Sequence, residues 1–210
     1  KRAMAWLTKI KGGVPFEVMA LDSSEDKSAK ENKGNLGYIT AMLPDGYYAM
    51  EKAIYSTRAG TVYAMPVRSN AGYHLIKVNA MRPARGEVEV SQILLRKTPD
   101  NATKTAQAKM RADSLCGVLR SNPSAWDEVC SKFSEDKQTA PKGGYIGFFG
   151  INRYQRAFED ASFSLEKDGD IYPSIVETSI GYHIIKRMSR RPVLPFETMK
   201  KALNDRVKRD

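Results

Sequence analysis

The sequence repeats itself once, with a period near 110 residues. Four segments recur in the same order at offsets between 108 and 110: Ser24–Lys27 as Ser134–Lys137, Gly34–Tyr38 as Gly144–Phe148, Met50–Ser56 as Phe158–Ser164, and Gly72–Lys77 as Gly181–Lys186. A period this long indicates two duplicated domains, because the units of a solenoid run about 20–50 residues. The chain is therefore expected to contain two modules of one kind.

The second copy, residues 85–191, is expected to be complete. Patterns of apolar residues and turn residues predict strands over 87–96, 145–149, 175–178 and 181–187, and helices over 102–120, 124–133 and 153–163. Ser124 is the expected N-cap of the helix that carries Trp126 and Cys130. The last two strands are joined by a tight turn and close the unit.

The first copy, residues 1–84, follows the same order but is expected to begin inside its first helix, at Lys1–Ile10. It has no counterpart of residues 86–110, and so none of the opening strand. We therefore expect a fragment of a longer protein whose first module is truncated. Residues 192–210 form the expected start of a C-terminal helical segment.

The net charge of +10 is spread thinly, with +5 over residues 1–84, +3 over 85–191 and +2 over 192–210. Nucleic-acid binding requires basic residues that cluster on one face, so it is disfavoured here. No apolar run approaches the roughly 18 residues of a membrane-spanning helix, so no transmembrane segment is expected.

Few residues offer metal or covalent chemistry. The two histidines and two cysteines do not make a zinc motif, and no GxSxG nucleophile motif occurs. Cys116 and Cys130 fall on the apolar faces of predicted helices, which favours core packing, and whether they pair is left open. His74 and His183 each lie in a Gly-Tyr-His-aliphatic-Ile-Lys strand. A lone histidine on a strand is more often structural than catalytic, but the repeated setting of the only two histidines weakens that interpretation.

The second copy resembles the parvulin-type (PpiC, rotamase) peptidyl-prolyl cis–trans isomerases. The resemblance rests on Phe133–Asp136, Gly143–Phe149, Ala157–Phe163 and Gly181–Ile185, which follow the family's order and spacing over about 100 residues. It implies an α+β fold for each module, with a small antiparallel sheet and flanking helices. Two such modules in tandem further resemble the SurA-type periplasmic chaperone-isomerases. The resemblance implies a periplasmic or cell-envelope location, clients that are unfolded proline-containing polypeptides, and no cofactor or metal.

The resemblance also implies a site in the second copy. Its polar, catalytic group corresponds to Asp136, Gln92, Thr178 and His183, and its proline pocket to Ile146, Phe149, Tyr154 and Phe158. In the family, the first strand normally carries a histidine where this chain has Gln92, and the pocket has a methionine where it has Tyr154.

A degenerate site is expected in the first copy, at Asp26, Leu36, Ile39, Met50 and His74. Two functions follow: a peptidyl-prolyl isomerase with chaperone character, or a non-catalytic peptide-binding module that uses the same cleft. We expect Gln92 and His183 to face one cleft from neighbouring strands, and activity to belong mainly to the second copy.

Overall fold

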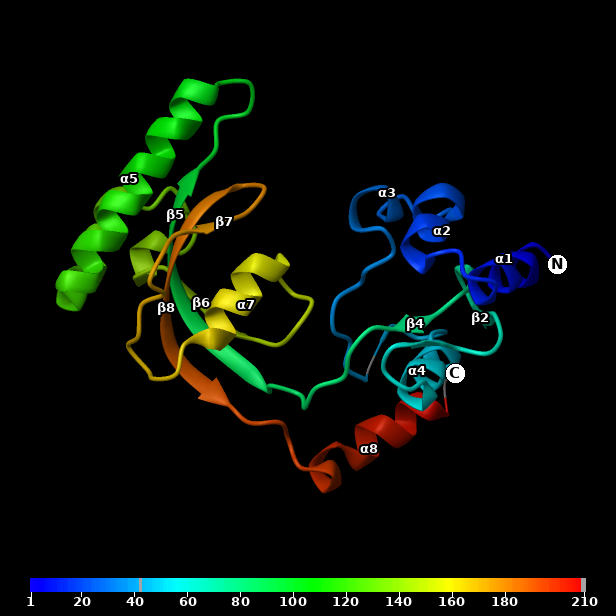
Figure 1. The fold of residues 1–210 in the computed structure, drawn as a ribbon. Coiled ribbons are helices and arrows are strands. Elements are labelled where there is room, and N and C mark those ends of the chain that lie inside the picture. Colours follow the sequence, from blue (N-terminus) through cyan, green and yellow to red (C-terminus); the bar gives the residue numbers. More distant parts are fainter. Residues whose placement is uncertain (42, 209–210) are drawn as a thin grey trace. The chain divides into compact units, whose positions relative to one another are not determined.

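The structure is a computed structural model that describes residues 1–41 and 43–208. The chain forms two compact units (Figure 1). Unit 2 is Arg85–Val193, and unit 1 combines Lys1–Ala84 with the segment that begins at Leu194. The tail expected at 192–210 therefore groups, from Leu194 onward, with unit 1.

Unit 2 is built on a four-stranded antiparallel sheet of order β6-β5-β8-β7. Its strands are β5 (Glu87–Arg96), β6 (Tyr145–Phe149), β7 (Val176–Glu177) and β8 (Gly181–Arg191). The central strands β5 and β8 pair along ten positions, from Glu87 opposite Arg191 to Arg96 opposite Gly181. Because β5 carries apolar side chains on both faces, both faces of the sheet are covered.

Helices cover the two faces of this sheet (Figure 1). On one face, α5 (Ala102–Ser121) and α6 (Trp126–Phe133) pack their apolar side chains against Ile93, Leu95 and Ile184. On the other face, α7 (Arg156–Ser164) packs Phe158 and Phe163 against Val90 and Ile185. Unit 2 thus has two hydrophobic cores that share one sheet.

The sequence predicted these elements in the right order, with one wrong cap. Ser124 lies in a 3₁₀ turn, Pro123–Ala125, and its hydroxyl donates to Asn122 Oδ1 at 2.6 Å instead of accepting an α6 amide. The turn runs directly into α6, which has no side-chain cap. The side-chain cap in this region belongs to α5, where Asn101 Oδ1 accepts from the Lys104 amide at 2.9 Å.

Unit 1 has shorter strands and a smaller core. Its elements are α1 (Arg2–Lys11), α2 (Phe16–Ser23), α3 (Ala29–Asn32), α4 (Tyr48–Ser56), β1 (Thr61–Val62), β2 (Val67–Ser69), β3 (Gly72–His74), β4 (Lys77–Val78) and α8 (Phe196–Val207). The strands form two two-stranded sheets, β1-β4 and β2-β3. Met50 and Ala53 of α4 pack on Val67, Ile76 and Val78, which repeats the α7 side of unit 2.

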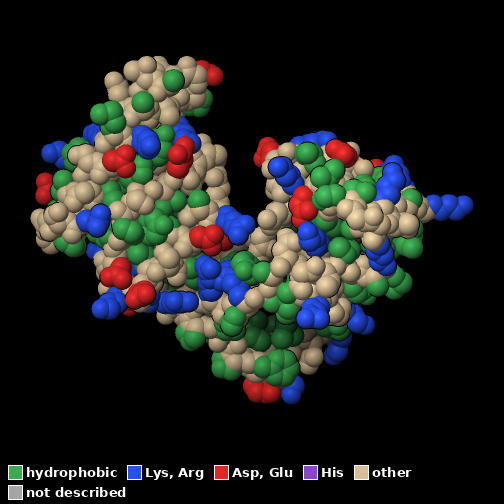
Figure 2. Space-filling model, in the orientation of Figure 1, with side chains coloured by type: hydrophobic (Ala, Val, Ile, Leu, Met, Phe, Trp, Pro, Cys, Tyr) green, Lys and Arg blue, Asp and Glu red, His purple; other side chains and the backbone are tan. Residues whose placement is uncertain are grey.

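The surface of the described residues is mixed in charge. On the face drawn in Figure 2, Lys and Arg side chains are interspersed with Asp and Glu and do not gather into one patch. Within residues 1–41 and 43–208, no helix is both long enough and apolar enough to cross a membrane.

Candidate functional site

A chain of hydrogen bonds links the polar residues that the sequence singled out in unit 2. Gln92 Nε2 donates to Asp136 Oδ2 at 2.9 Å, and Gln92 Oε1 lies 2.7 Å from His183 Nδ1. His183 Nε2 lies 2.7 Å from the Thr178 hydroxyl. The structure therefore brings together all four expected polar residues, from β5, β8, the end of β7 and the loop after α6.

The backbone holds Gln92 close to the loop that follows Asp136. Gly144 has a φ of +77°, and a Cβ atom on it would lie 2.0 Å from the Gln92 carbonyl oxygen, so only glycine fits there. This close approach lets the backbone N–H of Gln92 donate to the backbone carbonyl of Gly144 at 2.8 Å. Thr139, which sequence reasoning missed, donates its hydroxyl to Asp136 Oδ2 at 2.6 Å.

Asp136, at one end of this hydrogen-bonded chain, fixes the direction of every hydrogen bond in it. An ionised Asp136 only accepts, so the Gln92 amide nitrogen faces it and the Gln92 oxygen faces His183. His183 Nδ1 must then carry the proton, and Nε2 accepts from Thr178. With a neutral imidazole, each ring nitrogen of His183 has a partner: Nδ1–H donates to Gln92 and Nε2 accepts from Thr178.

The titration of the two ionisable groups agrees with these states. Burial lowers the pKa of His183 to about 4, against an ordinary value of 6.5, so the ring is neutral at pH 7. Partial burial raises the pKa of Asp136, but hydrogen bonds from Thr139, Gln92 and the backbone outweigh it and lower the pKa below its ordinary value. Asp136 is therefore ionised at neutral pH.

An aromatic cluster lies beside the polar chain. The rings of Phe149 and Phe158 are 6.0 Å apart, and Tyr154 lies 4.8 Å and 5.3 Å from them. The Phe158 ring meets the His183 ring edge-on at 5.2 Å, while Ile146 packs against the same core. Ile146, Phe149 and Phe158 together form the apolar floor of the site. Phe158 is only 2% exposed and Tyr154 is 40% exposed, so the Tyr154 ring covers this floor.

Glu159, a residue that sequence reasoning did not single out, holds the loop that carries Tyr154. Its buried carboxylate accepts from the backbone amides of Asn152, Arg153 and Tyr154 at 3.0, 2.6 and 2.8 Å. The repeat offered a signal, because Glu51 occupies the same place in unit 1 and accepts from the Leu43 amide.

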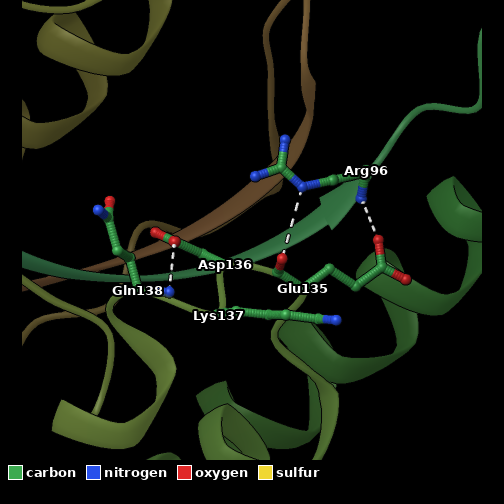
Figure 3. A pocket seen from close by; sticks show the side chains of 5 residues that line it. All are labelled: Arg96, Glu135, Asp136, Lys137 and Gln138. Atoms are coloured by element: carbon green, nitrogen blue, oxygen red, sulfur yellow. Dashed lines mark hydrogen bonds between the residues drawn. The ribbon is translucent and has the colours of Figure 1, made fainter.

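A pocket of about 540 Å³ opens beside the acidic end of the polar chain (Figure 3). Its walls are Arg96, Glu135, Asp136, Lys137 and Gln138. The Arg96 amide donates to Glu135 Oε2 at 2.6 Å, and the Gln138 amide donates to Asp136 Oδ1 at 3.3 Å. Asp136 thus lies between the buried chain and an open, charged pocket.

Comparison with known proteins decides the family. The sequence profile of the PPIC-type PPIASE domain matches this chain twice, over residues 1–82 and 79–191. The chain belongs to this family. The resemblance to parvulin-type isomerases and the α+β fold of two modules are thereby confirmed.

The relatives of this PPIC-type chain include chaperones. It is 30% identical to "Chaperone SurA" of Yersinia pestis bv. Antiqua (strain Antiqua) over 189 residues, which are 88% of this chain and 42% of that protein. It is 26% identical to "Chaperone SurA" of Escherichia coli O6:H1 over 195 residues, 91% and 44% of the two chains. The chain thus spans less than half the length of these curated relatives.

Among solved structures, the peptidylprolyl isomerase PrsA of Bacillus cereus is 26% identical. The alignment covers 60% of this chain and 44% of that chain, with a TM-score of 0.47.

The PPIC-type module of unit 1 keeps only part of the site. His74 Nε2 lies 2.6 Å from the hydroxyl of Ser69, the missed counterpart of Thr178. Met50 is buried in the core, whereas Leu36 is exposed. Ile39 lies half-buried in an irregular segment, and Asp26 accepts from the Ser28 amide at 2.9 Å. The structure does not assemble these five residues as it assembles those of unit 2.

Both cysteines of the second PPIC-type module are buried and free. Burial raises the pKa of Cys130 to about 11, and burial also raises that of Cys116. A thiol with such a pKa is not a thiolate at neutral pH, so it is a poor nucleophile. Among the residues that the structure describes, no group of three or more His, Cys, Asp or Glu side chains is placed to hold a metal ion.

Proposed function

We propose that unit 2 is a peptidyl-prolyl cis–trans isomerase that acts on unfolded, proline-containing polypeptides, and that the protein has a chaperone role in the folding of exported proteins. One observation carries the proposal: the Phe158 ring, on the apolar floor, meets His183 of the polar chain at 5.2 Å. Membership of the PPIC-type PPIASE family and similarity to SurA chaperones support it.

The reaction needs an apolar surface and a few oriented polar groups. Rotation about an X–Pro bond crosses a barrier of about 18–20 kcal/mol and leaves every covalent bond in place. A nucleophile is not required, which agrees with the neutral His183 and the protonated Cys130. The rate rises when the protein binds the twisted amide more tightly than either planar form.

Each part of the site would take one part of the substrate. The proline ring would pack on Phe149 and Phe158, where an apolar surrounding disfavours the charge-separated planar amide. Thr178 and His183 would orient the carbonyl group that precedes the proline. Gln92 and Asp136 would hold the His183 ring in the required tautomer and position.

Access to the apolar floor depends on Tyr154. Its ring lies over both phenylalanines, so a proline ring that reaches Phe158 must first displace it. We therefore expect movement of the 150–155 loop to accompany substrate binding.

The test is a proline-isomerisation assay on the chain, with both a short peptide and an unfolded protein as substrates. Phe158→Ala and Ile146→Ala should each lower kcat/KM about tenfold or more, because each removes part of the apolar floor. Met50→Ala, which changes the counterpart of Phe158 in unit 1, is the matched control and should leave the rate unchanged. Unchanged activity of a folded Phe158→Ala variant would refute the assignment.

A second candidate is a peptide-binding module without catalysis. Gln92 in place of the family's histidine, and the Tyr154 ring over Phe158, both favour it. This function predicts that unit 2 binds proline-containing peptides and that Phe158→Ala raises the Kd of this binding. The isomerisation rate should stay at the uncatalysed value.

We also propose a periplasmic or cell-envelope location, supported by the similarity to SurA-type chaperones. Fractionation of cells that express the protein at its natural level tests it, and recovery in the cytoplasm alone would contradict it.

A further inference from the structure

A pair of side chains joins the 150–155 loop to the turn between β7 and β8. Gln155 Nε2 donates to the Ser179 hydroxyl, and the Ser179 amide donates to Gln155 Oε1 at 3.0 Å. Both ends of the Gln155 carboxamide therefore bond to one residue. Gln155 is the N-cap residue of α7, yet its side chain caps no amide of that helix. The side chain is used instead for a contact with a segment 24 residues away.

This pair lies between the two halves of the site. Tyr154, whose ring covers the apolar floor, directly precedes Gln155. Thr178, whose hydroxyl bonds to His183 Nε2, directly precedes Ser179. The bonds between Gln155 and Ser179 therefore connect the residue that covers the floor to the end of the polar chain.

The turn between β7 and β8 is held in place by other groups. The Thr178 amide donates to the Gly181 carbonyl at 2.9 Å, and Lys97 Nζ donates to the Thr178 carbonyl at 2.9 Å. The Lys97 amide donates to the Ile180 carbonyl at 3.1 Å. Because these bonds fix the turn independently of Gln155, the partner that moves when the pair separates is the 150–155 loop.

The loop depends on Gln155 for its hydrogen bonds to this turn. Glu159 binds the amides of residues 152–154, but Glu159 belongs to α7, which directly follows the loop. Its bonds therefore hold the loop to α7 and not to the turn. Gln155 and Ser179 are both exposed, so water competes for their bonds. At the lower end of the usual range, each such bond changes an equilibrium about twofold.

The same two segments meet in unit 1. At the offsets of the repeat, Gly46 is the counterpart of Tyr154 and Asn70 is the counterpart of Ser179. A Cβ atom on Gly46, whose φ is +88°, would lie 1.9 Å from Asn70 Nδ2, so the Asn70 side chain lies against this glycine. The repeat thus keeps the approach of the two segments, and unit 2 adds an aromatic ring at this place.

We propose that Gln155 and Ser179 form a latch that holds Tyr154 over the apolar floor and closes this floor to a proline ring until the pair separates. A site that binds only in its open state has an apparent Kd equal to the intrinsic Kd divided by the open fraction. The latch therefore regulates the affinity of unit 2 for proline-containing segments, and this inference rests on the function proposed for that unit.

The experiment measures the Kd of the full chain for a fluorescein-labelled peptide that contains one Phe-Pro bond. Gln155→Ala removes both bonds of the latch and should lower the Kd about fivefold. Ser179→Ala removes one bond and should lower the Kd about twofold. Ser179→Thr keeps the hydroxyl and the amide, so this matched control should have the Kd of the parent. All three changes lie at exposed positions, outside the cores.

A second measurement shows whether the latch acts through Tyr154. In a Tyr154→Ala background, Gln155→Ala should leave the Kd unchanged, because no ring then covers the floor. In the parent without peptide, the NMR signals of the Tyr154 ring should carry ring-current shifts from Phe149 and Phe158, whose rings lie 4.8 and 5.3 Å away. Gln155→Ala should move these signals toward those of free tyrosine.

Three results would overturn the proposal. A higher Kd of Gln155→Ala would make Gln155 a contact for the substrate. An unchanged Kd, or Tyr154 ring signals that do not move, would show that the pair does not hold the ring. An equal gain of affinity in the Tyr154→Ala background would show that the pair acts elsewhere. Isomerisation at the uncatalysed rate, in a chain whose Kd responds as expected, would instead refute the isomerase function and support the latch.

Discussion

An amide side chain cannot change its protonation state near neutral pH, so Gln92 fixes the donors and acceptors around it. Its oxygen faces His183 and its nitrogen faces Asp136. A histidine at this position could reverse both roles by changing tautomer. The two members of the hydrogen-bonded chain that can take up a proton at acidic pH are therefore His183 and Asp136; burial opposes protonation of His183, and the hydrogen bonds that Asp136 accepts oppose protonation of its carboxylate.

We predict that unit 2 loses stability between pH 7 and pH 5. The folded pKa of His183 is about 4 and the ordinary value is 6.5, so the unfolded state binds a proton first. Stability is full above about pH 6.5 and falls as the pH drops toward 4. The loss from pH 7 to pH 5 is about 2 kcal/mol.

Urea unfolding followed by the fluorescence of the buried Trp126 measures this loss, in a Trp6→Phe background that leaves one tryptophan. His183→Gln should flatten the pH dependence. His74→Gln, which changes the histidine of unit 1, should leave it in place. An equal slope in the His183→Gln protein would show that another group is responsible.

We predict that Gln92→His gives isomerase activity equal to or above that of the parent, because it restores the residue usual in the family. Gln92→Leu should lower activity and cost about 1–3 kcal/mol of stability, since Asp136 and His183 each lose a hydrogen-bond partner. The measurements are kcat/KM and urea unfolding at pH 7. A folded Gln92→His protein with less activity than the parent would contradict the prediction.

At the scale of elements, the 150–155 loop is the segment that connects α7 to the apolar floor. Glu159 of α7 binds three successive amides of this loop, and Tyr154 at its end covers Phe158. A carboxylate can satisfy several amides at once, whereas a neutral amide has one acceptor oxygen. The position of Tyr154 therefore depends on the charge of Glu159.

We predict that Glu159→Gln destabilises unit 2 by about 1–3 kcal/mol, because charge-assisted hydrogen bonds of a buried group are lost. Hydrogen exchange at the amides of residues 152–154 should accelerate. Glu166→Gln, at an exposed position shortly after the same helix, is the control and should leave that exchange unchanged. Protection of these amides in Glu159→Gln equal to that of the parent would count against the role given to the carboxylate.

The sequence was sufficient for the elements of unit 2 and for the members of its polar chain. The apolar pattern of 87–96 predicted β5, and the family's spacing placed Gln92, Asp136, Thr178 and His183 near one another. It was insufficient where the outcome depends on packing. The ring of Tyr154 over Phe158 follows from rotamers and loop geometry, and the turn at Ser124 follows from the 3₁₀ conformation after Pro123. The repeat did contain the signal for Ser69 and Glu51.

At the scale of the molecule, the two units differ in how their cores are closed. Unit 2 has two cores on a four-stranded sheet, whereas unit 1 has one small core on two short sheets. A unit with its own cores can fold alone. Unit 2 meets this condition.

We predict that residues 85–193, produced alone, unfold cooperatively and keep isomerase activity within about twofold of the full chain, because all residues of the site lie inside this range. Residues 1–84 alone should show no isomerase activity. The measurements are urea unfolding and the proline-isomerisation assay. Activity that requires both fragments together would contradict this division.

The two buried thiols make it possible to time the opening of one module separately from the other. Cys116 and Cys130 are the only cysteines of the chain, and both lie in the core between α5, α6 and the sheet of unit 2. An alkylating reagent can reach them only when that core opens, so the growth of the alkylated mass follows the opening of unit 2. Unit 1, which has no cysteine, opens and closes without contributing to this signal.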